Sequence, residues 1–286
     1  MRTFRLILSK YNDAATNMAL DEALFLSYQE KGTEPVLRLY GWKPAAVSCG
    51  ISQDPSQLFQ DGHALNSSSF VRRPTGGGLI YHDDELTYSL VACAEDLGLE
   101  TMSVKDSYEA LTSFLIRAYR AMGLNACFAK EASETDSTAS PAEIASVCFG
   151  RKEEYDILVG GRKLGGSAQK RAKNIILQHG SIPLSLDHGK LTTLLKDPSL
   201  GCAIQATSLK EALGKDISSH ELKDTITDAF CSHFQVELRE SGLTSRENDL
   251  VRFLKETKYG TPEWNLNKND LSKISPHDDR TQTSLA

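Results

Sequence analysis

Three consecutive glycines constrain the fold of this chain more than any other feature. They are Gly76–Gly78, in the stretch VRRPTGGGLIYHDDELTYSL from Val71 to Leu90. A dinucleotide-binding fingerprint requires a helix after its glycines, whereas the residues that follow here are typical of a strand. A phosphate-binding loop would end in Gly-Lys-Ser/Thr, which is missing. We therefore expect a loop between two strands, where the lack of side chains lets the backbone approach a ligand or another segment closely.

Taken alone, the glycine loop has a simpler explanation as a tight turn or a β-bulge. The flanking residues Arg72, Arg73 and His82 favour a binding site, because one short stretch then supplies cations, backbone donors and an imidazole. An arginine pair is more often a solvated surface, however, and a lone histidine is more often structural. Both interpretations of this stretch remain open from its residues alone.

The composition narrows the class of protein. The chain has 286 residues with 40% hydrophobic and 24% charged content, which is typical of a globular fold. A net charge of −6 argues against a general nucleic-acid binder. There is no apolar run of membrane-spanning length, and the N-terminal sequence MRTFRLILSKYNDAA lacks the features of a signal peptide. We expect a cytoplasmic protein with neither nucleic acid nor membrane as a partner.

The cysteines do not predict a metal site. They show neither a CxxC motif nor zinc-site spacing, so we expect reduced thiols. The six positions are Cys49, Cys93, Cys127, Cys148, Cys202 and Cys231.

Strand and helix patterns are interspersed without strict βαβ alternation. Capping residues predict helices that begin near Asp13 or Thr16, Ser103, Ser218 and Thr244. Apolar runs predict strands over residues 4–8, 36–42, 45–50, 70–73, 79–82, 86–92 and 174–186. We expect a single mixed α+β domain over residues 1–265, whose largely antiparallel sheet is flanked by helices. Residues 266–286 have little apolar content and are expected to form a disordered tail.

A second group of glycines lies in CFGRKEEYDILVGGRKLGGSAQKRAKNIILQHGSI, residues 148–182. Two arms, Tyr155–Val159 and Arg162–Leu164, predict a hairpin whose turn is Gly160-Gly161. Lys163 follows this turn closely and has further glycines just after it. A lysine in a hairpin is normally exposed to solvent, so its place among glycines that admit a ligand is unusual.

The two glycine clusters together resemble a known family. RRPTGGGLIYHD, then Asp156 with GRKLGGSAQ, then LQHGSI are similar to the biotin/lipoate A/B protein ligase (cofactor transferase) family over roughly residues 1–265. Cys148 precedes a segment of the form GRK-x-x-GSAQ-x-R. That arrangement resembles the LipM-type octanoyl-[acyl carrier protein]:protein N-octanoyltransferases within the family. The resemblance implies a biotin/lipoate ligase-like fold.

The resemblance also implies an activity, its partners and a site. Cys148 would accept the acyl group as a nucleophile, and Lys163 would contact the acyl carbonyl. The donor would be octanoyl-acyl carrier protein. The acceptors would be lipoyl-domain proteins such as the glycine cleavage H protein and the 2-oxoacid dehydrogenase acyltransferase subunits. No cofactor or metal would be required. We expect the substrate to be bound by Arg72, Arg73, Gly76, Gly77, Gly78, His82, Gly165, Gly166, Ser167 and Ala168.

Thioester exchange explains why such residues would be needed. The attacking species is a thiolate, and a nearby ammonium on Lys163 would favour it and would stabilise the oxyanion. In its neutral form Lys163 is also one possible base for the amine of the acceptor. Arg72 and Arg73 could orient an acidic protein partner.

Three other functions stay open. Gly78 occupies a position where LipM-type members often have an arginine, and a full glycine triplet is more familiar in ATP-dependent lipoate–protein ligases, which use ATP and Mg²⁺ to form lipoyl-AMP. A related subgroup moves octanoyl from one lipoyl domain to another. A non-catalytic lipoyl-domain binding subunit is disfavoured, because it would need neither Cys148 nor Lys163.

Overall fold

A mixed sheet forms the centre of the protein. In the computed structural model, the described residues are 1–30, 33–59, 69–99, 103–132, 153–193, 195–196 and 206–273. The central sheet has six strands in the order β10-β11-β6-β2-β1-β13, and β1 pairs parallel with both β2 and β13 while the other pairs are antiparallel. Its strands are β1 (Arg2–Asn12), β2 (Val36–Trp42), β6 (Glu85–Cys93), β10 (Gly166–Ala172), β11 (Ile175–Pro183) and β13 (Val236–Glu240).

The remaining strands form two small sheets. One has the order β12-β9-β8-β7 and the other the order β4-β3-β5. Their bounds are β3 (Ala46–Cys49), β4 (Phe70–Arg72), β5 (Ile80–His82), β7 (Ala126–Phe128), β8 (Ile157–Val159), β9 (Arg162–Leu164) and β12 (Ala206–Thr207). The expected α+β class with a largely antiparallel sheet flanked by helices is confirmed. The two small sheets accompany the central sheet in the same α+β domain.

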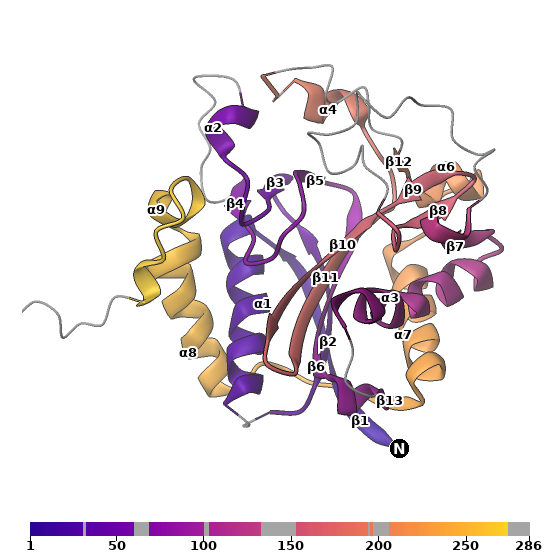
Figure 1. Cartoon of the computed structure of the whole chain (residues 1–286), viewed down its shortest axis with the longest axis horizontal. Helices are drawn as coiled ribbons and strands as arrows, with labels where there is room; N and C mark the ends of the chain where they lie inside the picture. Colours follow the sequence, from indigo (N-terminus) through magenta and orange to yellow (C-terminus); the bar gives the residue numbers. More distant parts are fainter. Residues whose placement is uncertain are drawn as a thin grey trace, which may run out of the picture.

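Helices cover both faces of the central sheet (Figure 1). On one side α1 (Ala14–Gln29) packs against α8 (Ser245–Leu254), and on the other α3 (Val104–Ala121) packs against α7 (Ser219–Phe234). The core on the second side includes edge-to-face contacts of Phe230 with Phe4 and Phe114, with ring centroids 5.4 and 5.3 Å apart. The shorter helices and turns are α2 (Pro55–Leu58), η1 (Ala94–Leu97), η2 (Ala129–Glu131), α4 (His188–Thr192), α6 (Leu209–Leu213), η4 (Lys255–Tyr259), α9 (Pro262–Asn265) and η5 (Leu271–Lys273).

The folded chain continues beyond residue 265. The backbone carbonyl of Leu266 accepts a hydrogen bond from Arg72, and Asp270 forms a buried ion pair with Lys258 at 2.8 Å. The expected start of the tail at residue 266 is therefore wrong, because polar contacts rather than apolar burial hold residues 266–273 in place. Residues 274–286 lie outside the described part.

None of the helices that the structure describes combines the length and the apolar character that crossing a bilayer requires.

Candidate active site

The glycine loop between β4 and β5 lies directly against the end of β3. The backbone amide of Ile51 donates to the carbonyl of Thr75, and that of Arg73 donates to the carbonyl of Cys49. A side-chain carbon added to Gly50 would lie 1.9 Å from the carbonyl oxygen of Gly77, which itself has a φ of +84°. Glycine is thus required at both positions, because the two backbone segments touch.

Arg73 holds the glycine loop closed. Its buried guanidinium donates through Nη1 to the carbonyl and the hydroxyl of Ser48, at 2.9 and 2.7 Å. Through Nη2 it donates to the carbonyl oxygens of Gly76 and Gly78, at 3.0 and 2.7 Å. Arg73, rather than a neighbouring strand, supplies the hydrogen-bond donors for these loop carbonyl groups. It thereby fixes the shape of the loop.

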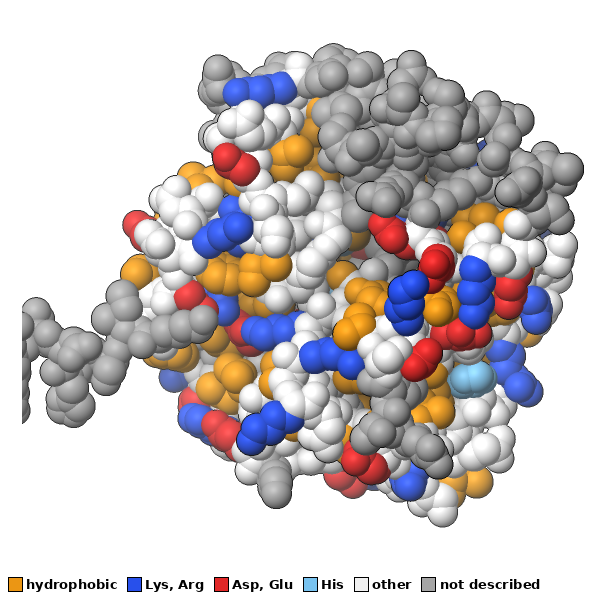
Figure 2. Space-filling model, in the orientation of Figure 1, with side chains coloured by type: hydrophobic (Ala, Val, Ile, Leu, Met, Phe, Trp, Pro, Cys, Tyr) orange, Lys and Arg blue, Asp and Glu red, His pale blue; other side chains and the backbone are white. Residues whose placement is uncertain are grey.

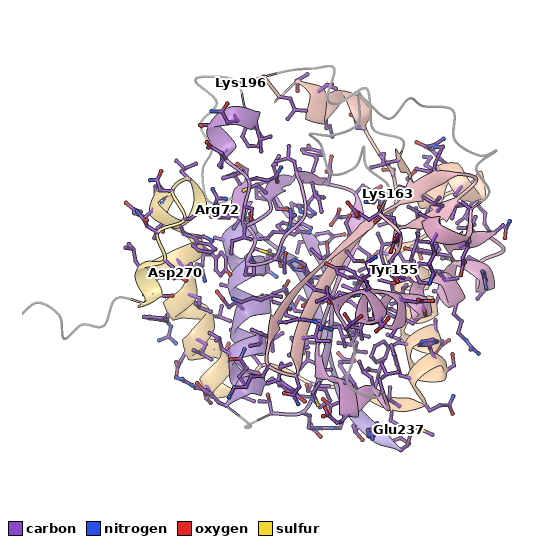
Figure 3. The ribbon with its side chains drawn as sticks, viewed as in Figure 1. Arg72, Tyr155, Lys163, Lys196, Glu237 and Asp270 are labelled. Atoms are coloured by element: carbon purple, nitrogen blue, oxygen red, sulfur yellow. The ribbon has the colours of Figure 1, made fainter. Side chains whose placement is uncertain are left out.

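Arg72 points away from the glycine loop. It is 1% exposed, and its guanidinium donates to backbone carbonyls of Gln53, Trp264 and Leu266, among others (Figure 3). The expectation that Arg72 and Arg73 orient an acidic partner is corrected. Both guanidinium groups are buried and are engaged with the chain's own oxygens.

The second glycine cluster is largely strand. Gly166–Ala172 forms β10, an edge strand paired antiparallel with β11. Gly165 makes the bend between β9 and β10 with a φ of +79°, and an added side-chain carbon there would lie 2.0 Å from the carbonyl oxygen of Ser181. This bend places Lys163 of β9 beside Gly166 of β10.

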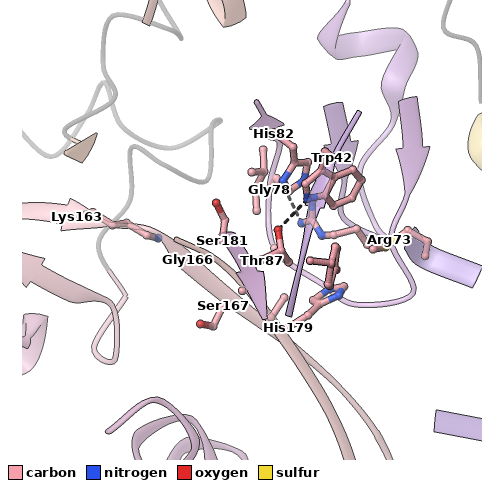
Figure 4. A pocket seen from close by; sticks show the side chains of 16 residues that line it. Trp42, Arg73, Gly78, His82, Thr87, Lys163, Gly166, Ser167, His179 and Ser181 are labelled. Atoms are coloured by element: carbon pink, nitrogen blue, oxygen red, sulfur yellow. Dashed lines mark hydrogen bonds between the residues drawn. The ribbon is translucent and has the colours of Figure 1, made fainter. Parts of the chain in front are cut away.

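An inner pocket lies between the glycine loop and β10 (Figure 4). Its wall is largely apolar because its polar atoms are paired within the protein. Trp42 stacks on His82 with ring centroids 3.9 Å apart and donates to the Thr87 hydroxyl at 2.8 Å. The lining residues are Met18, Tyr40, Trp42, Arg73, Gly77, Gly78, Ile80, His82, Thr87, Lys163, Gly166, Ser167, Ala168, His179, Gly180 and Ser181.

A buried carboxylate stabilises this wall. Glu85 lies 2.8 Å from Nδ1 of His82 and accepts hydrogen bonds from Ser181 and Thr87. Burial opposes ionisation of Glu85, but the attraction of His82 and these hydrogen bonds outweigh it and lower the pKa of the carboxyl group. The second ring nitrogen of His82, Nε2, is hydrogen-bonded to the hydroxyl of Ser48. The imidazole therefore presents its ring face to the pocket, and both of its nitrogens are engaged.

Lys163 stands where the inner pocket meets a second, outer cavity. Its Nζ lies 2.8 Å from Oδ2 of Asp156, and the two side chains are 7% and 11% exposed. Lys163 is therefore not the solvent-exposed lysine that a hairpin usually carries. The outer cavity is lined by Gly77, Val104, Lys105, Tyr108, Thr112, Leu115, Glu153, Glu154, Tyr155, Asp156, Ile157, Lys163, Leu164, Gly165, Gly166, Ser167 and Ser181.

His179 connects the glycine loop to a buried charge network. Its Nδ1 lies 2.9 Å from Asp21 and its Nε2 lies 2.8 Å from the hydroxyl of Thr75. Asp21 also pairs with Arg38 at 2.6 Å, where both side chains are fully buried. Burial lowers the pKa of His179, although Asp21 opposes the shift. The neutral imidazole can donate to Asp21 and accept from Thr75 at once.

We expect the protein to lose stability below neutral pH through His179. The pKa of His179 is lower in the folded chain than in the unfolded one, where it is about 6.5. Between these values the unfolded chain binds more protons, so stability rises with pH up to about 6.5 and is then level. The free energy of unfolding should therefore fall as the pH is lowered from about 7.5 to 5.5. Urea denaturation measures this difference.

His179→Asn is the matched variant, because its amide nitrogen can replace Nδ1 as the donor to Asp21. We expect it to lose part of the pH dependence. The buried carboxyl groups do not interfere, since the pKa values of Asp21 and Glu85 lie below the ordinary carboxyl range. An unchanged pH dependence in the variant would contradict the assignment.

The structure brings most of the expected site residues together. Eight line the inner pocket: Arg73, Gly77, Gly78, His82, Lys163, Gly166, Ser167 and Ala168. Gly165 lines the outer cavity, whereas Arg72 and Gly76 line neither of these two cavities. Cys148 lies outside the described residues. Tyr40 and Trp42, which sequence reasoning missed, project from one face of β2. Their alternate spacing on a strand is the one signal that could have found them.

Among the described residues there is no group of three or more His, Cys, Asp or Glu side chains that could hold a metal ion.

The comparisons with known proteins show which family the chain belongs to. The model of the lipoyl protein ligase A/B catalytic domain matches residues 13–231. The octanoyltransferase LipM of Bacillus subtilis (strain 168) is 37% identical over 276 residues, which cover 93% of this chain and 99% of the relative. The octanoyltransferase LipM of Halalkalibacterium halodurans is 35% identical over 280 residues, which cover 94% and 100%.

Solved structures show the same fold. A crystal structure of lipoate-protein ligase A bound with ATP superposes with a TM-score of 0.75 at 26% identity, over 92% of this chain and 98% of that one. A putative lipoate protein ligase from T. acidophilum with bound lipoic acid superposes with a TM-score of 0.74 at 25% identity, over 92% and 99%. The biotin/lipoate ligase-like fold expected from the motifs is confirmed, and the chain belongs to the lipoyl protein ligase A/B catalytic-domain family.

Proposed function

We propose that this protein transfers an octanoyl group from octanoyl-acyl carrier protein to the lipoyl-domain lysine of a lipoate-dependent protein, through a thioester on Cys148. The observation that carries the proposal is a buried lysine, Lys163, at the junction of an apolar pocket and a second cavity. The relatives named octanoyltransferase LipM, which match nearly the whole chain, support the choice of octanoyl as the acyl group.

The inner pocket suits an unbranched acyl chain. Trp42 donates to Thr87, Thr87 donates to Glu85, and Glu85 is hydrogen-bonded to His82. The acyl chain would therefore meet ring faces and glycine backbone without leaving these polar groups unpaired. With the chain inside, its carbonyl carbon would lie near Lys163. Gly77 and Gly166 line both cavities and bring no side chain to this entrance.

The first half-reaction is a thioester exchange. The Cys148 thiolate attacks the carbonyl carbon of the donor thioester, a new C–S bond forms, and the donor thiolate leaves. Lys163 stabilises the negative oxygen of the intermediate. A thioester is already activated, so the proposed reaction uses neither ATP nor another cofactor. The second half-reaction transfers the acyl group from Cys148 to the acceptor amine.

A second candidate is an ATP-dependent lipoate–protein ligase. The full glycine triplet ending at Gly78 favours it, as does the fold shared with a ligase whose structure holds ATP. In that case the same pocket would hold an acyl-adenylate, with Lys163 on its carbonyl.

Intact-mass spectrometry separates the two candidates. After incubation with octanoyl-acyl carrier protein and without ATP, we expect one octanoyl group per chain. It should be absent from Cys148→Ala and present in Cys231→Ala, a control cysteine on α7. Lack of the adduct, together with ATP-dependent lipoylation of a lipoyl domain, would establish the ligase instead. An octanoylated lipoyl domain as donor tests the amidotransferase alternative in the same assay.

A further inference from the structure

Asp156 has one carboxylate oxygen that is engaged and one that is open. Oδ2 accepts a hydrogen bond from the backbone amide of Glu153 at 2.8 Å and pairs with Nζ of Lys163 at 2.8 Å. In the described part of the chain, no hydrogen bond uses Oδ1. The side chain is 11% exposed and lines the outer cavity but not the inner pocket. A carboxylate held in this way has a fixed position, and its second oxygen forms no hydrogen bond with the described residues.

The outer cavity suits a side chain with an apolar stem and a cationic end. Tyr108 and Tyr155 contribute aromatic rings to its wall, and Glu153 contributes negative charge, while Glu154 is paired with Lys105 at 3.0 Å. Tyr155 already accepts a cation on its ring, since Nζ of Lys130 lies 4.8 Å from the ring centroid. Figure 2 shows acidic side chains beside the hollowed part of this face. A lysine side chain of a protein acceptor has this chemistry.

We propose that Asp156 is the base that takes the proton from the acceptor lysine, which enters through the outer cavity. This inference rests on the proposed function. The acceptor arrives as an ammonium, whose proton passes to Oδ1 of Asp156. The free amine attacks the thioester carbonyl carbon and forms a C–N bond. The C–S bond then breaks, and the Cys148 sulfur takes the second proton of the nitrogen, so that an amide, a thiol and a protonated Asp156 result. Asp156 returns its proton to solvent.

A carboxylate base allows Lys163 to keep its proton throughout the second half-reaction. A lysine that stabilises the oxyanion must carry its proton, whereas a lysine that acts as a base must lack it. Lys163 lies against the carboxylate of Asp156 and lines both cavities, while Asp156 lines the outer cavity alone. These positions match the two roles. Lys163 lies at the acyl carbonyl, where it stabilises the oxyanion, and Asp156 lies on the side from which the amine enters, where it takes the proton.

Asp156→Asn tests the inference in a single-turnover assay. The variant is first loaded with octanoyl from octanoyl-acyl carrier protein, and the acyl-enzyme is then mixed with a lipoyl-domain acceptor or with hydroxylamine. We expect transfer to the lipoyl domain to be slower by about a hundred-fold. Discharge by hydroxylamine, which is a neutral nucleophile at pH 7 and gives up no proton before its attack, should match the wild type.

Asp216→Asn is the matched control, because Asp216 also pairs with a lysine at 2.8 Å but lies on the surface away from both cavities. It should behave as wild type in every step. Transfer from the Asp156→Asn acyl-enzyme at the wild-type rate would overturn the inference. So would an equal loss with hydroxylamine, or failure to load, since Asp156 would then act by holding Lys163. An absent adduct in the wild type would instead refute the proposed function.

Discussion

Replacing Lys163 with methionine is expected to slow acyl-enzyme formation by about a thousand-fold, which is the upper range for losing one oxyanion-stabilising donor. Methionine keeps a flexible apolar stem of similar length, so the junction of the two cavities stays filled. The ammonium that would stabilise both the thiolate and the oxyanion is lost. Stopped reactions analysed by intact mass measure the rate directly.

The variant also leaves Asp156 without its cation, although the Asp156 side chain is only 11% exposed. An unpaired, nearly buried carboxylate could distort the site by itself. The double variant Lys163→Met/Asp156→Asn removes that charge, and acyl-enzyme formation should remain as slow as in Lys163→Met. Lys105→Met is the control for a lysine of the same cavity, because Lys105 is 71% exposed and pairs with Glu154. Wild-type rates in Lys163→Met would remove Lys163 from the chemistry.

Local chemistry explains which elements could be predicted from the sequence. The helices that begin after Ser103, Ser218 and Thr244 were all predicted from capping residues, and each cap accepts a hydrogen bond from the backbone amide three residues later. The hairpin at Gly160-Gly161 was predicted because both glycines supply the positive φ that its turn requires. Each of these signals lies within a few residues of sequence.

The missed elements depend on distant partners. β10 was not among the predicted strands because Gly166, Ser167 and Ala168 have weak strand propensity, and its pairing with β11 decides its structure. From its neighbours in the sequence, Arg72 would be a cation on the surface. Its guanidinium instead donates to the carbonyls of Trp264 and Leu266, which lie almost 200 residues away in the sequence. No local pattern reveals such contacts.

The site was predicted in the same uneven way. The motifs identified the residues of the inner pocket that lie next to glycines. The motifs assigned the wrong role to Arg73, because its guanidinium donates hydrogen bonds to the glycine loop rather than to a protein partner. Motif positions thus predicted which segments meet, while the use of each charged group depended on burial that the sequence does not display.

Gly50→Ala is expected to distort the inner pocket, although Gly50 itself does not line it. The added methyl group would lie 1.9 Å from the carbonyl oxygen of Gly77, which is backbone and cannot rotate away. Relieving the contact moves Gly77, a residue of both cavities, by about an ångström, and a displacement of this size can cost on the order of a hundred-fold in rate. We also expect a loss of about 1–3 kcal/mol in the free energy of unfolding.

Gly76→Ala is the matched control from the same loop, because a side-chain carbon there would meet no atom within 4 Å and its φ is not positive. It should change stability by less than about 0.5 kcal/mol and leave acyl-enzyme formation near the wild-type rate. If Gly50→Ala behaved like Gly76→Ala in denaturation and in the acylation assay, the close contact between β3 and the glycine loop would not shape the pocket. If both variants failed alike, the loop would need glycine for its flexibility instead. The difference between the two alanines therefore tests whether the glycine triplet acts as a rigid wall that is held in place by its neighbour.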